Sequence, residues 1–143
     1  MTIKSRLWIS RALVGLVLFI NLQCALAFLS SPAGFAPAYE LSDVPGTAAI
    51  RALAVLFLMW NVPYVVAFSN PIKYRLSLYE ALAMQSLGLI GETYIWMQVP
   101  PEFTVLRSSI VRFILFDGFG LLALATAAWL IGKQNKNLEE VLE

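Results

Sequence analysis

The stretch RFILFDGFGLLALATAAWLIG, residues 112–132, decides the fold class, because it is almost wholly apolar and yet contains Asp117. A helix that crosses a bilayer needs roughly 20 mostly apolar residues, and this stretch reaches that length. Three other stretches have a similar length and composition. The predicted spans cover about residues 7–29, 47–69, 76–97 and 108–132. The sequence therefore predicts an all-α, single-domain protein, an integral membrane four-helix transmembrane bundle followed by a polar tail over residues 133–143.

Composition supports this fold class and excludes several functions. Of the 143 residues, 59% are hydrophobic and 13% are charged, which is more apolar surface than a soluble domain of this size could cover. The net charge of +1 gives no attraction to nucleic acid. Histidine is absent and Cys24 is the only cysteine, so most metal, triad and disulfide chemistry is excluded within one chain. We predict no catalytic residue and no metal site, we identify no cofactor, and we regard an enzyme as the weaker hypothesis.

The positions of lysine and arginine predict the orientation, since cytoplasmic flanks retain positive charge. Basic residues flank the first span, the second connection and the end of the fourth span: Lys4, Arg6 and Arg11, then Lys73 and Arg75, then Lys133 and Lys136. The opposite side has Glu40, Asp43 and Glu102, with Arg51 and Arg107 at helix ends. We expect a multi-pass protein of the cell membrane with both termini cytoplasmic. The stretch ALAF at residues 25–28 also resembles a signal-peptide cleavage site, although the preceding apolar run is long and Arg11 interrupts its start.

Four charged residues are expected within the outer half of the spans, where facing lipid would be costly. On a rise of about 1.5 Å per residue, Asp117 lies roughly 14 Å from the outer end of its helix, near the bilayer midplane. The same measure places the others in the outer half of the bundle. The predicted intramembrane network is Arg51, Glu92, Arg112 and Asp117. We expect at least one arginine to lie within about 4 Å of a carboxylate.

Polar and aromatic residues on the second and third spans suggest a second use for the same region. Gln85 and Glu92 share one face of the third span with Gly88, because they recur at helical spacing. Trp60 lies mid-span, away from the interfaces where tryptophan is usual. Asn61 precedes Pro63, which removes one backbone hydrogen bond near Met59. The candidate lipophile-binding residues are Gln85, Glu92, Trp60 and Asn61. Asp117 either fixes the rotation of its helix or belongs to this site.

The layout along the chain resembles the DoxX-like group of small four-helix membrane proteins: a first helix opening RALVGLVLF, residues 11–19, a long connection rich in proline and glycine, and three further spans. This resemblance implies a compact bundle that can serve as a membrane subunit of a quinone-linked oxidoreductase, and it carries over no catalytic residues. Two hypotheses follow. The chain is a non-catalytic accessory subunit, in contact with lipid and with a protein partner or a second copy, or it binds a lipophilic molecule such as a quinone or lipid in an outer-half polar cavity.

Overall fold

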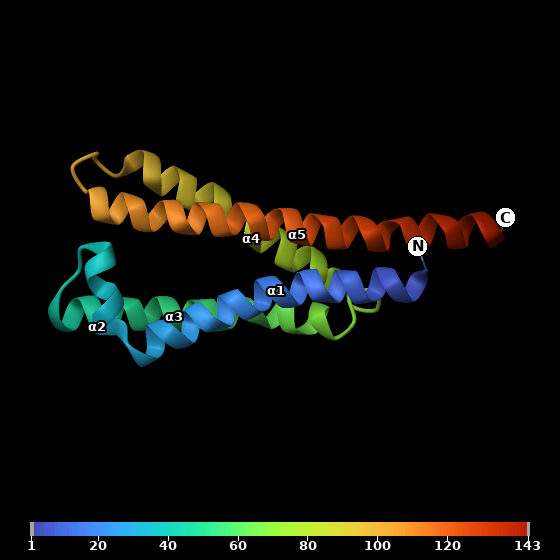
Figure 1. The fold of residues 1–143 in the computed structure, drawn as a ribbon, viewed down its shortest axis with the longest axis horizontal. Helices are drawn as coiled ribbons and strands as arrows, with labels where there is room; N and C mark the ends of the chain where they lie inside the picture. The colour runs from blue at the N-terminus through green and yellow to red at the C-terminus, as the bar shows by residue number, and fades with distance from the viewer. Residues whose placement is uncertain (1, 143) are drawn as a thin grey trace.

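The computed structural model describes the backbone of residues 2–142 and the side chains of residues 2–132 (Figure 1). All regular structure in residues 2–142 is helical, so the predicted all-α class is confirmed. Four long helices and two short helical segments follow one another. Their bounds are α1 Ile3–Ser30, α2 Pro32–Phe35, the 3₁₀ helix η1 Ala36–Tyr39, α3 Asp43–Ser69, α4 Arg75–Gln98 and α5 Thr104–Leu142.

The four long helices form a ring in which each packs on two neighbours. The packed pairs are α1 with α3, α3 with α4, α4 with α5, and α5 with α1. Across residues 2–142, neither diagonal pair, α1 with α4 or α3 with α5, packs directly. Helix α1 begins and α5 finishes at one end of the bundle, which we call the termini end (Figure 1). The opposite end carries α2 and η1, and we call it the connection end.

Three helices are long and apolar enough to cross a membrane by length and composition: α1, α3 and the Thr104–Gly132 part of α5. Helix α4, which corresponds to the predicted third span, is not among them within the described residues. Its sequence is more polar because it carries Glu80, Gln85 and Glu92. The four predicted spans therefore correspond to four long helices, but within the described residues only three of these are long and apolar enough to cross a membrane.

The first connection, which is long and rich in proline and glycine, contains two short helical segments. Pro32 and Pro37 each occupy the first turn of a short helix, α2 and η1. Proline is tolerated there because the first backbone N–H groups of a helix have no intrahelical acceptor. The same reason allows α3 to begin at Asp43, ahead of Pro45 and of the predicted start at Thr47. Helix α5 also continues beyond its predicted end at Gly132, although the side chains of the tail lie outside the described residues.

Short polar contacts fasten the connection end and the termini end. The Ser109 hydroxyl of α5 donates to the Ala38 carbonyl at 2.6 Å, and the Leu106 N–H donates to the Glu40 carboxylate at 3.4 Å. At the other end, Arg11 Nε donates to the Phe68 carbonyl in the last turn of α3 at 3.1 Å. These contacts tie η1 to α5 and α1 to α3, so the ring is held at both ends.

The core is divided into two clusters. The termini-side core draws on all four long helices, with buried Val14, Val17, Leu18, Tyr64, Ala67, Leu78, Ala81, Leu124, Ala127 and Ile131. The connection-side core contains buried Phe28, Ala36, Ile50 and Ala54, with partly buried aromatic rings from α2, η1, α3 and α5 packed on it. Among the described side chains, α4 contributes none to this second cluster. The last buried residue of α4 is Gln85, so the second half of this helix contributes no buried side chain.

Candidate functional site

A cavity of about 480 Å³ lies between the connection-side core and the second half of α4. All four long helices line it, and its walls are mainly apolar. The aromatic rings of Phe57 and Phe113, whose centroids are 6.0 Å apart, form one wall of the cavity. Tyr39 packs on Phe113, and burial raises the pKa of the Tyr39 hydroxyl above its usual range. The volume falls within the range of about 300–1,000 Å³ that is usual for small-molecule sites.

The cavity opens sideways between α3 and α4. Trp60 on α3 is 49% exposed, while Leu87 and Ile95 on α4 are 69% and 48% exposed, and all three line the cavity. The opening arises because the buried face of α4 ends at Gln85. A molecule could therefore enter from the side of the bundle, past apolar side chains, without crossing either end.

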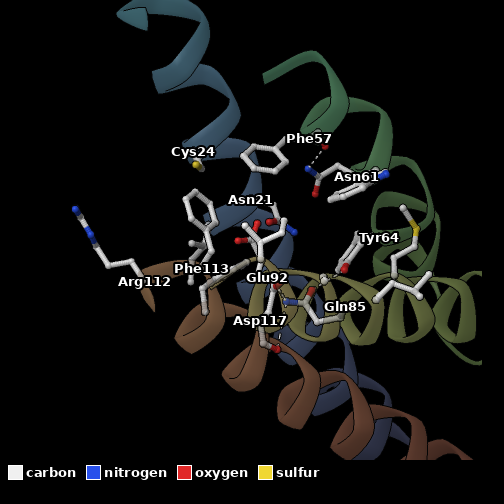
Figure 2. Close-up of a pocket in the computed structure, with 18 residues that line it drawn as sticks. Asn21, Cys24, Phe57, Asn61, Tyr64, Gln85, Glu92, Arg112, Phe113 and Asp117 are labelled. Carbon is white, nitrogen blue, oxygen red and sulfur yellow. Dashed lines mark hydrogen bonds between the residues drawn. The ribbon is translucent and has the colours of Figure 1, made fainter. Parts of the chain in front are cut away.

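The floor of the cavity is a chain of hydrogen bonds across three helices. The Tyr64 hydroxyl of α3 donates to Gln85 Oε1 at 2.6 Å, and Gln85 Nε2 of α4 donates to Asp117 Oδ1 at 2.8 Å. The same amide lies 3.4 Å from the Asp117 carbonyl. Figure 2 shows these three side chains side by side, with both hydrogen bonds drawn. The chain fixes the rotation of Asp117 and engages both the oxygen and the nitrogen of the Gln85 amide.

Two glycines make room for this chain. A Cβ at Gly88 would overlap Asp117 Oδ2 and lie 3.1 Å from its Cγ. A Cβ at Gly120 would lie 2.5 Å from Gln85 Nε2. By contrast, a Cβ at Gly91 or Gly118 would meet nothing within 4 Å. Only the first two glycines are therefore required by the close approach of α4 and α5, a distinction that spacing does not reveal.

Asn61 presents an unused acceptor to the cavity. Its Nδ2 donates to the Phe57 carbonyl at 2.6 Å, which fixes the orientation of the amide. Within the described side chains, its Oδ1 has no hydrogen-bond partner, although Asn61 is only 2% exposed. Figure 2 shows this oxygen on the side of the amide that faces the labelled cavity residues. A buried polar atom is normally paired, because leaving one unpaired costs about 1–3 kcal/mol.

Glu92 and Asn21 complete the polar lining. Both side chains point into the space between α1 and α4 (Figure 2), and neither makes a hydrogen bond within the described side chains of residues 2–132. Arg112 also lines the cavity, but its guanidinium is directed away from the other labelled residues and donates to the Ser109 hydroxyl at 3.3 Å. The inward groups therefore include free acceptors on Glu92 and Asn61 and the amide of Asn21, which can donate and accept.

The structure brings together three of the four residues of the predicted network. Glu92, Arg112 and Asp117 line one cavity, whereas Arg51 is exposed on α3 outside it. The predicted ion pair is absent from the side chains of residues 2–132, because Asp117 accepts from Gln85 and Arg112 turns outward. All four candidate lipophile-binding residues, Gln85, Glu92, Trp60 and Asn61, line the cavity.

Sequence reasoning missed several lining residues. Tyr64 completes the hydrogen-bond chain, and Phe57, Phe113 and Phe116 form apolar walls. A signal was available for α3, since residues 57, 61 and 64 recur at four and three and so share one helix face. On α5, Phe113 and Phe116 precede Asp117 by four and one residues. Their positions did not indicate a cavity, because phenylalanine is also common on faces that contact lipid.

Comparison with protein-family models, with curated protein sequences and with solved structures finds no match for this chain.

Proposed function

We propose that this chain is a four-helix integral membrane protein that binds a lipophilic small molecule in the cavity between α3 and α4. The observation that carries the proposal is the sideways opening at Trp60, Leu87 and Ile95, which leads to an apolar cavity with a few inward polar groups. Such a combination is the usual form of a ligand site. A lateral opening suits a ligand that dissolves in lipid.

Helix α4 serves as the fourth span in this proposal. Its 24 residues extend about 36 Å at 1.5 Å per residue, enough to cross a hydrocarbon core of about 30 Å. Gln85 and Glu92 lower its apolar content, but both face the cavity. Polar side chains within a span are tolerated when they face the interior of the bundle.

A photoreactive probe tests the site. A diazirine derivative of phenylbutanol is irradiated with the protein in lipid nanodiscs, and crosslinked peptides are identified by mass spectrometry. We expect labelling of residues 57–64 and 84–95 that excess phenylbutanol suppresses. Labelling that is spread over all helices and is not suppressed would contradict the proposal, because it would report only contact with lipid.

A matched pair of glycine variants controls this experiment. Gly91 lines the cavity, and a Cβ there meets nothing within 4 Å, so Gly91→Leu should fill space and abolish the suppressible labelling. Gly118 has equally free surroundings and does not line the cavity, so Gly118→Leu should leave labelling unchanged. Equal behaviour of the two variants would place the probe elsewhere.

We also propose that the termini end is cytoplasmic, because the basic residues of α1 and of the α3–α4 turn gather there. In a Cys24→Ala background, Ala38→Cys lies at the connection end and should react with a membrane-impermeant maleimide added outside intact cells. Reaction only after permeabilisation would reverse the orientation.

The accessory-subunit role and the relationship to DoxX-like proteins stay as second proposals, since both rest on the sequence layout. Co-purification of a larger protein in constant ratio would support the accessory role. A ligand cavity and an accessory role are compatible in one chain.

A further inference from the structure

The hydrogen-bonding groups of the cavity show an imbalance that bears on the class of ligand. Three of the donors around it are already engaged by the protein. The Tyr64 hydroxyl donates to Gln85, the Gln85 amide donates to Asp117, and the Asn61 amide donates to the Phe57 carbonyl. A ligand that offers only acceptors, such as a quinone, would find the Asn21 amide as a donor but none at Tyr64, Gln85 or Asn61.

Acceptors, in contrast, remain free. Asn61 Oδ1 is buried without a partner, and no protein donor within residues 2–132 reaches Asp117 Oδ2 or the Glu92 carboxylate. Three independent helices present these groups to the same cavity. A ligand that donates hydrogen bonds would satisfy all three.

The charge of the lining narrows the ligand further. Glu92 and Asp117 are the carboxylates of the cavity, and Arg112, the one cation among the described lining residues, has its guanidinium turned away. Carboxylates that are removed from water need a positive partner or a proton. Lysine and arginine are otherwise absent from the lining within the described side chains, so a cationic ligand could supply that partner.

The aromatic walls suit a cation as well. Phe57 and Trp60 of α3 and Phe113 and Phe116 of α5 all line the cavity, and Phe116 lies one residue from Asp117. The faces of aromatic rings attract cations, most strongly where water is excluded. An apolar chain on the ligand would pack against the same rings.

Resting on the binding function proposed above, we infer that the ligand is a lipophilic ammonium ion. Its protonated amine lies among Asp117, Glu92 and Asn61, and its apolar part lies toward the opening at Leu87 and Ile95. An amine of this kind can be a free amphiphile or the headgroup of an aminophospholipid.

Two probes of equal shape test the inference. Phenylbutylamine is protonated at neutral pH, whereas phenylbutanol is neutral and of almost the same size. Each competes with the diazirine probe in nanodiscs of phosphatidylcholine. We expect the amine to compete about tenfold more effectively than the alcohol. Labelling of empty nanodiscs corrects for the different partitioning of the two compounds.

Variants connect this preference to the named residues. Glu92→Gln removes a charge that holds no hydrogen bond within the described side chains, so the fold should persist while the preference for the amine falls severalfold. Asp117→Asn should act in the same direction. Glu80→Gln, an exposed site on the same helix, is the matched control and should retain the full preference.

The outcomes separate the two proposals. If both compounds compete equally in the wild type, the ammonium inference is overturned and the lipophile site stands. If neither competes, both proposals are wrong. If the preference survives both Glu92→Gln and Asp117→Asn, the charge argument is overturned. Addition of phosphatidylethanolamine identifies the source, since competition by the lipid supports a headgroup and its absence supports a free amine.

Discussion

The same four long helices form a closed core in one half of the bundle and line a cavity in the other. At the termini end, all four long helices contribute buried residues to one closed core. At the connection end, α1, α3 and α5 pack around aromatic rings, while α4 contributes nothing buried beyond Gln85. The difference arises from α4, whose first half has Leu78 and Ala81 and whose second half has Gly88, Gly91 and Glu92. A bundle can therefore place stability in one half and a cavity in the other.

Truncating one large side chain in each half should give the largest difference in stability between the two halves. Leu124 is fully buried in the termini-side core, and Leu124→Ala should lower the free energy of unfolding by about 2–5 kcal/mol. Ile95 on the cavity rim is half exposed, and Ile95→Ala should cost less than about 1 kcal/mol. Thermal unfolding of the detergent-solubilised variants measures both. Equal losses would mean that the connection half is packed as closely as the termini half.

Asp117 lies where the two halves meet, and its replacement should have the next largest effect. Asp117→Leu leaves the Gln85 amide without its acceptor and should cost up to about 3 kcal/mol. Asp117→Asn keeps the shape and an acceptor oxygen, so it should be milder. Yield and thermal stability in detergent distinguish the two. If Asp117→Asn leaves stability intact and abolishes ligand binding, the main role of Asp117 is in the site rather than in the fold.

Two glycines of α4 allow a closely packed position and an open position to be compared within one helix. Gly88→Ala places a methyl group against the Asp117 carboxylate and should cost about 1–2 kcal/mol through overpacking. Gly91→Ala meets open space and should be neutral or slightly stabilising, because alanine favours helix more than glycine does. The measurement is again thermal unfolding. A loss of similar size for both would show that helix propensity, and not the contact with Asp117, sets the effect.

The Tyr64 hydroxyl belongs to the same hydrogen-bond chain as Asp117, and its removal should have a smaller effect on stability. Tyr64→Phe leaves Gln85 Oε1 without its donor and should cost about 1 kcal/mol. Tyr79→Phe on the exposed face of α4 is the control and should be neutral. A neutral Tyr64→Phe would imply that the hydrogen-bond chain contributes no net stability.

Arg51 should show the smallest effect. It is exposed on α3 and does not line the cavity, so Arg51→Gln should change the free energy of unfolding by less than about 0.5 kcal/mol and leave probe competition unchanged. A larger effect on probe competition would show that Arg51 contributes to the ligand site.

Sequence alone determined the helical class and the approximate positions of the long helices, because apolar runs of sufficient length can satisfy their backbone only as helices in lipid. It also identified Gln85, Glu92, Trp60 and Asn61, since polar or misplaced aromatic residues within apolar helices stand out from their surroundings. The short helices of the first connection were not predicted, because proline excludes a helix interior but not a first turn.

Tertiary structure decided which partner each polar group takes. Depth along a helix placed Arg51, Arg112 and Asp117 in the same half of the bundle, but a pairing also depends on rotation about each helix axis and on which helices are neighbours. The ring order brings α4 against α5, so Asp117 meets Gln85, while Arg112, about 140° around the same helix at five residues' separation, turns outward to Ser109. The cavity likewise exists because α4 contributes no described side chain to the connection-side core. The sequence of one helix does not show which neighbours it packs against.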